Sequence, residues 1–451
     1  MGLDISIELL TLIMFGSLLA LLMAGLPLAF VTGGLACVFL FILGDARALN
    51  IVPSRIFPLM TNYQLSAIPL FIFMAAMLER AGIINDMFDV IYKVLGGVKG
   101  GLASATIIAS TILAAMVGVI GAAVVTMGII ALPAMLKRGY DPKIAMGSIM
   151  AGGTLGILIP PSILAIIYAV VAEQSVGALF IGAVIPGLML SGLYILYVTV
   201  RCYINPDLGP PIPMEERVST REKIHLLGKM SAPISLIVVV LGVIFSGVAT
   251  PVEAAGIGTF GAFIVAAIHR RLDWPTIREA CLTTLKASAM VIWIMFGATI
   301  FVGLYVLQGG QQFVQETMQG YGLGPWGILI VMQIILIVLG MFLDWVGILL
   351  LCVPIFVPII KSLGAAAFGF DNADDLVLWF GVLYLVNMQM SFLSPPFGYA
   401  LFYLRGVAPD SIPMSDIFRA AIPFLLLQVV GLLICMLVPE VITWLPGLVY
   451  R

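Results

Sequence analysis

The sequence predicts an all-α polytopic membrane protein. Of its 451 residues, 62% are hydrophobic and only 10% are charged, whereas soluble domains carry roughly 25% charged residues. A membrane-crossing helix needs about 20 mostly apolar residues, and polar breaks divide the chain into many stretches of at least that scale. The 21 Lys and Arg residues nearly balance the 23 Asp and Glu residues, so we expect a lipid bilayer around the chain and no nucleic-acid partner.

Most of the apolar stretches have the length of one span. They lie at about 5–25, 27–43, 52–79, 178–200, 231–249, 254–269, 283–308 and 417–437. Two further stretches, 142–171 and 376–404, are each interrupted by a Pro-Pro pair, at Pro160 and at Pro395. Proline removes a backbone donor and breaks a helix interior, so we expect each of these two spans to be a broken helix.

The stretches 101–136 and 325–361 are nearly twice as long as one span. Glycines occupy the middle of the first, at Gly118 and Gly121, and Asp344 with Gly347 occupies the middle of the second. Each stretch is either two full crossings or a re-entrant hairpin that enters and leaves on one side. We favour the hairpin, because irregular backbone at membrane depth is tolerated where protein or a cavity surrounds it.

The positions of the Lys and Arg residues indicate on which side of the membrane each loop lies. With ten single crossings and two hairpins, all but four of the 21 Lys and Arg residues fall on one side. The four on the opposite side are Arg47, Arg55, Lys361 and Arg451. By the positive-inside rule the cation-rich side is cytoplasmic, which places both termini in the periplasm. Double crossings of the long stretches would leave these loops on the same sides, so the charge count does not separate the two alternatives.

The two halves of the chain share one order of elements. Residues 1–200 and 231–451 each run through ordinary spans, a hairpin, a Pro-Pro span and a final span, and a Pro-rich cytoplasmic loop at 201–230 joins them. Each half holds five crossings, an odd number, so the second copy must be inverted. Inverted repeats with broken helices at the midplane are typical of secondary transporters, including those of ion-transporter-like elevator architecture.

Oxygen-bearing groups gather at these breaks. A Pro-Pro pair leaves earlier carbonyls without partners, and a bound Na⁺ can satisfy them. Asp344 is the sharpest candidate, because intramembrane carboxylates are costly and mark functional sites. The predicted ion-binding residues are Gly118, Gly121, Thr126, Thr154, Gly156, Pro160, Asp344, Gly347, Ser394 and Pro395. The predicted substrate-binding residues are Ser162, Asn387, Gln389 and Ser391. We expect no other cofactor.

Enzyme signatures are missing from the sequence. Gly228-Lys229 is followed by Met230 and is therefore not a P-loop, and no second intramembrane acid pairs with Asp344. We therefore expect no enzymatic activity, and transport energised by an ion gradient.

Several motifs resemble those of one family, the large membrane subunit of TRAP (tripartite ATP-independent periplasmic) transporters. They comprise Ile68–Ile72, Gly128–Tyr140, Gly153–Ile163, Gly340–Asp344 and Ser394–Gly398, and they cover both halves of the chain. In the first hairpin tip, Gly118-Val-Ile-Gly121 stands where many members have serines. The departure removes a serine ligand there and leaves backbone carbonyls and Thr126.

The resemblance implies sodium-coupled uptake of organic acid anions, such as 2-oxo acids or dicarboxylates, by an elevator movement in the bacterial inner membrane. It also implies two partners, a small four-helix membrane subunit and a periplasmic solute-binding protein. Two alternatives stay open at this point. One is a self-sufficient ion-coupled anion transporter or antiporter without a binding protein, and the other is a channel or membrane scaffold that ignores the sodium gradient.

Overall fold

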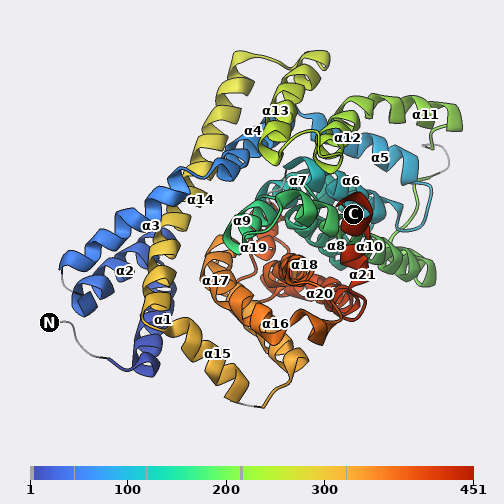
Figure 1. The fold of residues 1–451 in the computed structure, drawn as a ribbon. Helices are drawn as coiled ribbons and strands as arrows, with labels where there is room; N and C mark the ends of the chain where they lie inside the picture. Colours follow the sequence, from blue (N-terminus) through green and yellow to red (C-terminus); the bar gives the residue numbers. More distant parts are fainter. Residues whose placement is uncertain (1–4, 45, 118–119, 214–216, 321, 451) are drawn as a thin grey trace.

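The computed structural model describes residues 5–44, 46–117, 120–213, 217–320 and 322–450, and the regular structure of these residues is entirely helical (Figure 1). Seven of the helices are long and apolar enough to cross a membrane, and two bent helix pairs would bring the number to nine. The prediction of an all-α polytopic membrane protein is confirmed. The inverted relation of the two halves stays a prediction.

One body of the molecule is built from helices near the start of each half. Figure 1 shows α1, α2, α3 and the long α14 side by side, with α4 and α13 continuing them. Helix α12 packs against α13 and completes this body. The bounds are α1 Ile7–Met23, α2 Leu28–Gly44, α3 Ile51–Met60, α4 Ala67–Arg80, α12 Ser231–Phe245, α13 Pro251–Ile268 and α14 Trp274–Leu307. At 1.5 Å per residue, the 34 residues of α14 extend about 51 Å, well beyond a hydrocarbon core of about 30 Å. This helix packs along both α2 and α4.

The other body contains the two long stretches and the two broken helices. Each long stretch forms a pair of helices, α6 with α7 and α16 with α17, and each Pro-Pro span forms two helices separated by a break. In the first half the bounds are α6 Gly101–Val117, α7 Ile120–Lys137, α8 Pro142–Thr154, α9 Ile163–Ala172 and α10 Val176–Ile204. In the second they are α16 Pro325–Gly340, α17 Trp345–Leu363, α18 Ala373–Leu393, α19 Tyr399–Arg405, α20 Met414–Leu437 and α21 Glu440–Tyr450.

Helix α18 lies at the centre of this second body. Each of its residues from Leu376 to Leu393 is buried, and α16, α20, α10 and α17 pack around it. A helix that is apolar all round belongs in such a position. The oxygen-bearing side chains of α18 are therefore enclosed by protein and do not face lipid.

The structure differs from the sequence prediction at 52–79, which was expected to be a single span. The chain bends by 61° between residues 47–60 and 63–80, because Asn62 caps a new short helix by accepting the Gln64 N–H at 2.9 Å. The short 3₁₀ helices of the chain are η1 Ala46–Asn50, η2 Tyr63–Ser66, η3 Leu155–Ile157, η4 Pro206–Leu208 and η6 Ala365–Phe368.

Three segments predicted as loops contain helices. These are α5 Ile83–Leu95, α11 Thr220–Lys229 within the 201–230 loop, and α15 Gly310–Gly320. Helix α5 is amphipathic, with Met87 and Phe88 buried while Asp86 and Asp89 are exposed. Such a helix has too little apolar length to span a bilayer, which explains why a hydropathy argument left it among the loops.

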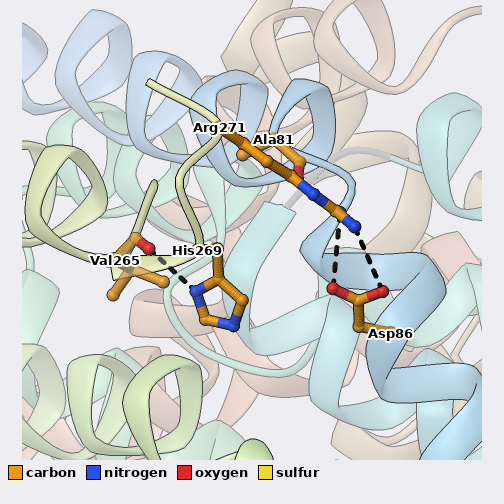
Figure 2. Close-up of polar contacts among 5 residues, drawn as sticks. All are labelled: Ala81, Asp86, Val265, His269 and Arg271. Carbon is orange, nitrogen blue, oxygen red and sulfur yellow. Dashed lines mark hydrogen bonds and ion pairs between the residues drawn. The ribbon is translucent and has the colours of Figure 1, made fainter. Parts of the chain in front are cut away.

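The turn between α13 and α14 is tied to the turn between α4 and α5 (Figure 2). The Arg271 guanidinium donates to the Ala81 carbonyl at 2.8 Å and forms an ion pair with Asp86 at 3.3 Å. Nearby, His269 Nδ1 lies 2.8 Å from the Val265 carbonyl oxygen. The Arg271 contacts join the start of α5 to the first body on the side predicted to be cytoplasmic, and the His269 contact lies within the end of α13.

Candidate functional site

Asp344 lies at the tip of the second hairpin, between α16 and α17. It is the N-cap residue of α17, and its carboxylate accepts the Val346 N–H at 3.2 Å. Asp is favoured at such positions because it satisfies an unpaired helix donor. The next carbonyl, that of Trp345, accepts the Tyr384 hydroxyl of α18 at 3.3 Å. The tip is therefore fastened to the central helix, and one carboxylate edge remains for another ligand.

Three tyrosines from the second broken helix lie near this carboxylate. Tyr384, Tyr399 and Tyr403 all lie close enough to Asp344 to interact with it electrostatically. The tip of the first hairpin reaches the same place, because a Cβ atom on Gly121 would lie 3.1 Å from the Tyr403 ring. Helix α19 thus stands between the two hairpin tips. Gly118, the other predicted glycine of the first tip, lies outside the described residues.

Two backbone oxygens converge at the second break. Ser394 caps the end of α18, and its hydroxyl donates to the Met390 carbonyl at 2.7 Å. A Cβ atom on Gly398 would lie 2.5 Å from the Phe392 oxygen and 2.8 Å from the Ser394 oxygen. These two carbonyl groups therefore converge on Gly398, whose N–H the Ser394 carbonyl accepts at 3.0 Å, and only glycine fits there.

The first break is enclosed by side chains of both halves. Thr154 ends α8, donates its hydroxyl to the Ala151 carbonyl at 2.8 Å and accepts the Gln428 amide of α20 at 3.3 Å. Ser162 caps α9 and donates to the Ile157 carbonyl at 2.6 Å. Gly156 and Pro160 are buried in the backbone between these two residues. The hydroxyl protons of Thr154 and Ser162 are thus used locally, while their oxygen lone pairs can still accept.

Amide side chains fill the interior beside α18. The Asn387 amide donates to the side-chain oxygen of Gln333 at 2.7 Å and to its carbonyl at 2.9 Å. Gln389 is fully buried, and neither of its amide atoms has a hydrogen-bond partner in the described part of the chain. Ser391 donates to the Asn387 carbonyl at 3.4 Å and packs against Gly340 of α16. The four predicted substrate residues therefore lie inside the helical packing.

The last two predicted residues lie on the second arms of the hairpins. Gly347 packs against Leu28 at the start of α2, so the second hairpin touches the first body there. Thr126 is half-buried on α7. The prediction missed Gln333 and Gln428, although each is an amide in an otherwise apolar stretch, the same signal that singled out Asn387.

An open crevice of about 530 Å³ lies beside the Asp344 tip. Three elements form it: the end of α1, the residues before Asp344, and the start of the chain after the second break. Its lining residues are Leu19, Leu22, Met23, Phe342, Leu343, Phe397, Tyr399 and Phe402. The crevice therefore lies between α1 of the first body and the tip of the second hairpin with the start of α19.

Comparison with known proteins identifies the family. The family model described as "Tripartite ATP-independent periplasmic transporter, DctM component" matches residues 15–441. The chain belongs to this family of TRAP transporter large permeases. It is 34% identical to the C4-dicarboxylate TRAP transporter large permease protein of Pseudomonas aeruginosa over 91% of this chain and 92% of that one. The corresponding protein of Rhodobacter capsulatus is 31% identical over 97% and 99% of the two chains.

A solved structure shows a similar fold. The YdaH transporter of Alcanivorax borkumensis superposes with a TM-score of 0.62 at 14% sequence identity, covering 93% of this chain and 98% of that chain. Together these similarities confirm the predicted family and make this chain a multi-pass transport subunit. TRAP large permeases work with a small membrane subunit and a periplasmic binding protein, and theirs is a family of transporters and not of enzymes.

Proposed function

We propose that this TRAP large permease imports small organic acid anions across the bacterial inner membrane with sodium as the coupling ion. Asp344 carries the proposal, because it places a carboxylate at the tip of the second hairpin, near α19, which also contacts Gly121 of the first hairpin. A buried carboxylate is stable in its ionised form only when a positive charge or hydrogen-bond donors compensate it. A sodium ion supplies that charge, and it leaves only when the transport cycle releases it.

The proposed sodium ligands at the second site are the free edge of the Asp344 carboxylate and the oxygens of the second break. The Phe392 and Ser394 carbonyls already converge at Gly398, and Pro395 cannot donate a hydrogen bond to them. A hard cation prefers such oxygen ligands. Gly347, on the first turn of α17, completes the close packing of the tip.

A second, uncharged sodium site is proposed at the first break. Its ligands would be the Thr154 oxygen and carbonyls between Gly156 and Pro160, with the first hairpin tip opposite. The tip residues of the prediction are Gly118, Gly121 and Thr126. Broken-helix carbonyls of this kind bind coupling ions in transporters with repeated halves. The two sites differ in charge, so sodium affinity should depend on Asp344 more than on Thr154.

The two bodies support an elevator movement. The second hairpin is predicted to enter from the periplasmic side, yet its tip packs on Leu28, beside the α1–α2 turn that the cation count places in the cytoplasm. In our proposal the second body, which contains the hairpins, has therefore moved toward the cytoplasm, and its crevice opens to the cytoplasm. The opposite position would receive the anion from the binding protein.

The proposed cargo is a carboxylate, such as a 2-oxo acid or a dicarboxylate, by analogy with the relatives named as C4-dicarboxylate permeases. The residues predicted to bind it, Ser162, Asn387, Gln389 and Ser391, lie behind the surface of the breaks. We propose that they hold the broken helices in the shape that the anion meets.

Reconstitution tests the proposal. The chain, its small subunit and its binding protein are placed in liposomes under an imposed sodium gradient, a proton gradient or none, and uptake of labelled carboxylates is measured. We expect uptake only with the sodium gradient. Asp344→Asn should abolish the sodium response, whereas Asp410→Asn, at an exposed acid after α19, should behave like the wild type.

Two results would contradict the proposal. Uptake that ignores the sodium gradient would indicate a channel or a differently coupled carrier. Full uptake by this chain alone would indicate a self-sufficient transporter and would remove the binding protein from the mechanism.

A further inference from the structure

We infer that the cargo of this transporter carries a single carboxylate on an apolar body about the size of a ring, and that the crevice beside Asp344 holds this body. The inference rests on the proposed function and narrows its substrate class. It follows from the lining of the crevice, from the exposure of its aromatic rings and from the placement of the nearby charges.

Seven of the crevice's eight lining side chains are apolar, and Tyr399 supplies the remaining hydroxyl. Phe342 and Phe397 face each other across the tip, with ring centroids 5.9 Å apart, and Phe402 lies one turn along α19 from Tyr399. These three phenylalanines are 45%, 53% and 48% exposed. The rings come from the hairpin tip and from the broken helix, the two elements that the proposed function places around the cargo.

Exposed rings of this kind favour an apolar guest. Burying apolar surface removes it from water, and aromatic rings add edge-to-face contacts with a second ring. A crevice of about 530 Å³ is within the usual size range of small-molecule sites, which is roughly 300–1,000 Å³. This volume admits both a four-carbon diacid and an acid with a phenyl or branched alkyl body, so the apolar lining, and not the size of the crevice, favours the apolar body.

The positions of the charged residues also favour a cargo with a single carboxylate. Lys, Arg and His are missing from the residues that line the crevice. The cation at the end of α19, Arg405, donates instead to the carbonyls of Ile412 at 2.7 Å and Pro409 at 3.4 Å. One carboxylate can face the sodium held at Asp344 and the Tyr399 hydroxyl. A second carboxylate would find no cationic partner among the lining residues, and placing it against the phenylalanine and leucine side chains would be unfavourable.

Binding to the membrane complex separates the two substrate classes. The complex of this chain with its small subunit is purified without the binding protein, so that the binding protein does not select the ligand. Its affinities for phenylacetate and for succinate are measured in sodium and in choline buffer by thermal stabilisation and by competition. We expect phenylacetate to bind at least ten-fold more tightly than succinate, and only with sodium present.

A charge introduced into the crevice should reverse this preference. Phe402→Arg should weaken phenylacetate binding at least ten-fold and strengthen succinate binding, since the guanidinium can pair with a second carboxylate. Phe57→Arg is the matched control, because Phe57 is an exposed phenylalanine of α3 outside the crevice. Phe397→Leu, which keeps an apolar side chain, should still weaken phenylacetate binding by several-fold even if Phe402→Arg folds poorly.

Three outcomes would overturn the inference. They are succinate binding as tight as phenylacetate binding, binding of neither acid, and phenylacetate binding that Phe402→Arg and Phe397→Leu both leave unchanged. The last result would place the apolar guest elsewhere. In each case the gradient-driven uptake measured above still decides the proposed function separately, so failure of the substrate class and failure of sodium coupling are distinguishable.

Discussion

The contact between Gly340 and Ser391 gives the sharpest test of how the second hairpin packs on α18. A Cβ atom on Gly340 would overlap both the Cβ and the Oγ of Ser391, and it would lie 3.3 Å from the Ser391 Cα. Both residues are buried. A serine has no flexible end that can swing away, so Gly340→Ala must push α16 from the central helix. Overpacking of this kind costs about 1–3 kcal/mol of unfolding free energy.

The assay is thermal unfolding of the purified chain, combined with sodium-dependent uptake in liposomes. Gly340→Ala should lower the unfolding temperature, and the double variant Gly340→Ala/Ser391→Gly should restore most of the loss, because it removes both overlapping atoms. Gly192→Ala is the control, since a Cβ atom on Gly192 of α10 would meet no heavy atom within 4 Å. Equal stability of Gly340→Ala and the wild type, or no recovery in the double variant, would refute this packing.

Three further substitutions test other parts of the structure in the same unfolding assay. Asn387→Leu should lower the free energy of unfolding by about 1–3 kcal/mol, because it leaves Gln333 without its hydrogen-bond partner. The double variant Asn387→Leu/Gln333→Leu should recover part of this loss, and additive losses would argue against the pair. Thr250→Ala should cost about 1 kcal/mol by removing the N-cap of α13, and an unchanged midpoint would contradict that cap. Arg271→Gln should cost at most about 1 kcal/mol, less at high salt, because its ion pair with Asp86 is half-exposed; a large salt-independent loss would show that this estimate of the pair is wrong.

The sequence predicted the helical elements of the second body well, because each is announced by composition. Apolar length indicated the helices, and the pairs at Pro160 and Pro395 indicated the two breaks. Asp344 was recognisable as a site candidate for a related reason, since a carboxylate in a 37-residue apolar stretch, 325–361, has few explanations. These features depend on local rules of backbone and solvation.

The features that the sequence did not predict depend on contacts between distant segments. Nothing local in the sequence places Tyr403 against Gly121, or joins Gln428 to Thr154. The same holds for the hydrogen bond between Asn387, which is predicted to contact the cargo, and Gln333. A buried amide is satisfied by whichever neighbour tertiary packing supplies, and that neighbour cannot be inferred from spacing along the chain.

The two hairpin tips differ in sequence because each lies against a different part of the surroundings of α19. Glycine at position 121 lets the Tyr403 ring approach the backbone, and a longer side chain there would push α19 away from the first tip. The second tip instead places Asp344 near the same helix. Helix α19 lies near both tips. It therefore couples their positions, because a shift of α19 toward one tip changes its distance to the other. Binding of a cation at Asp344 would therefore be felt at Gly121 through Tyr403.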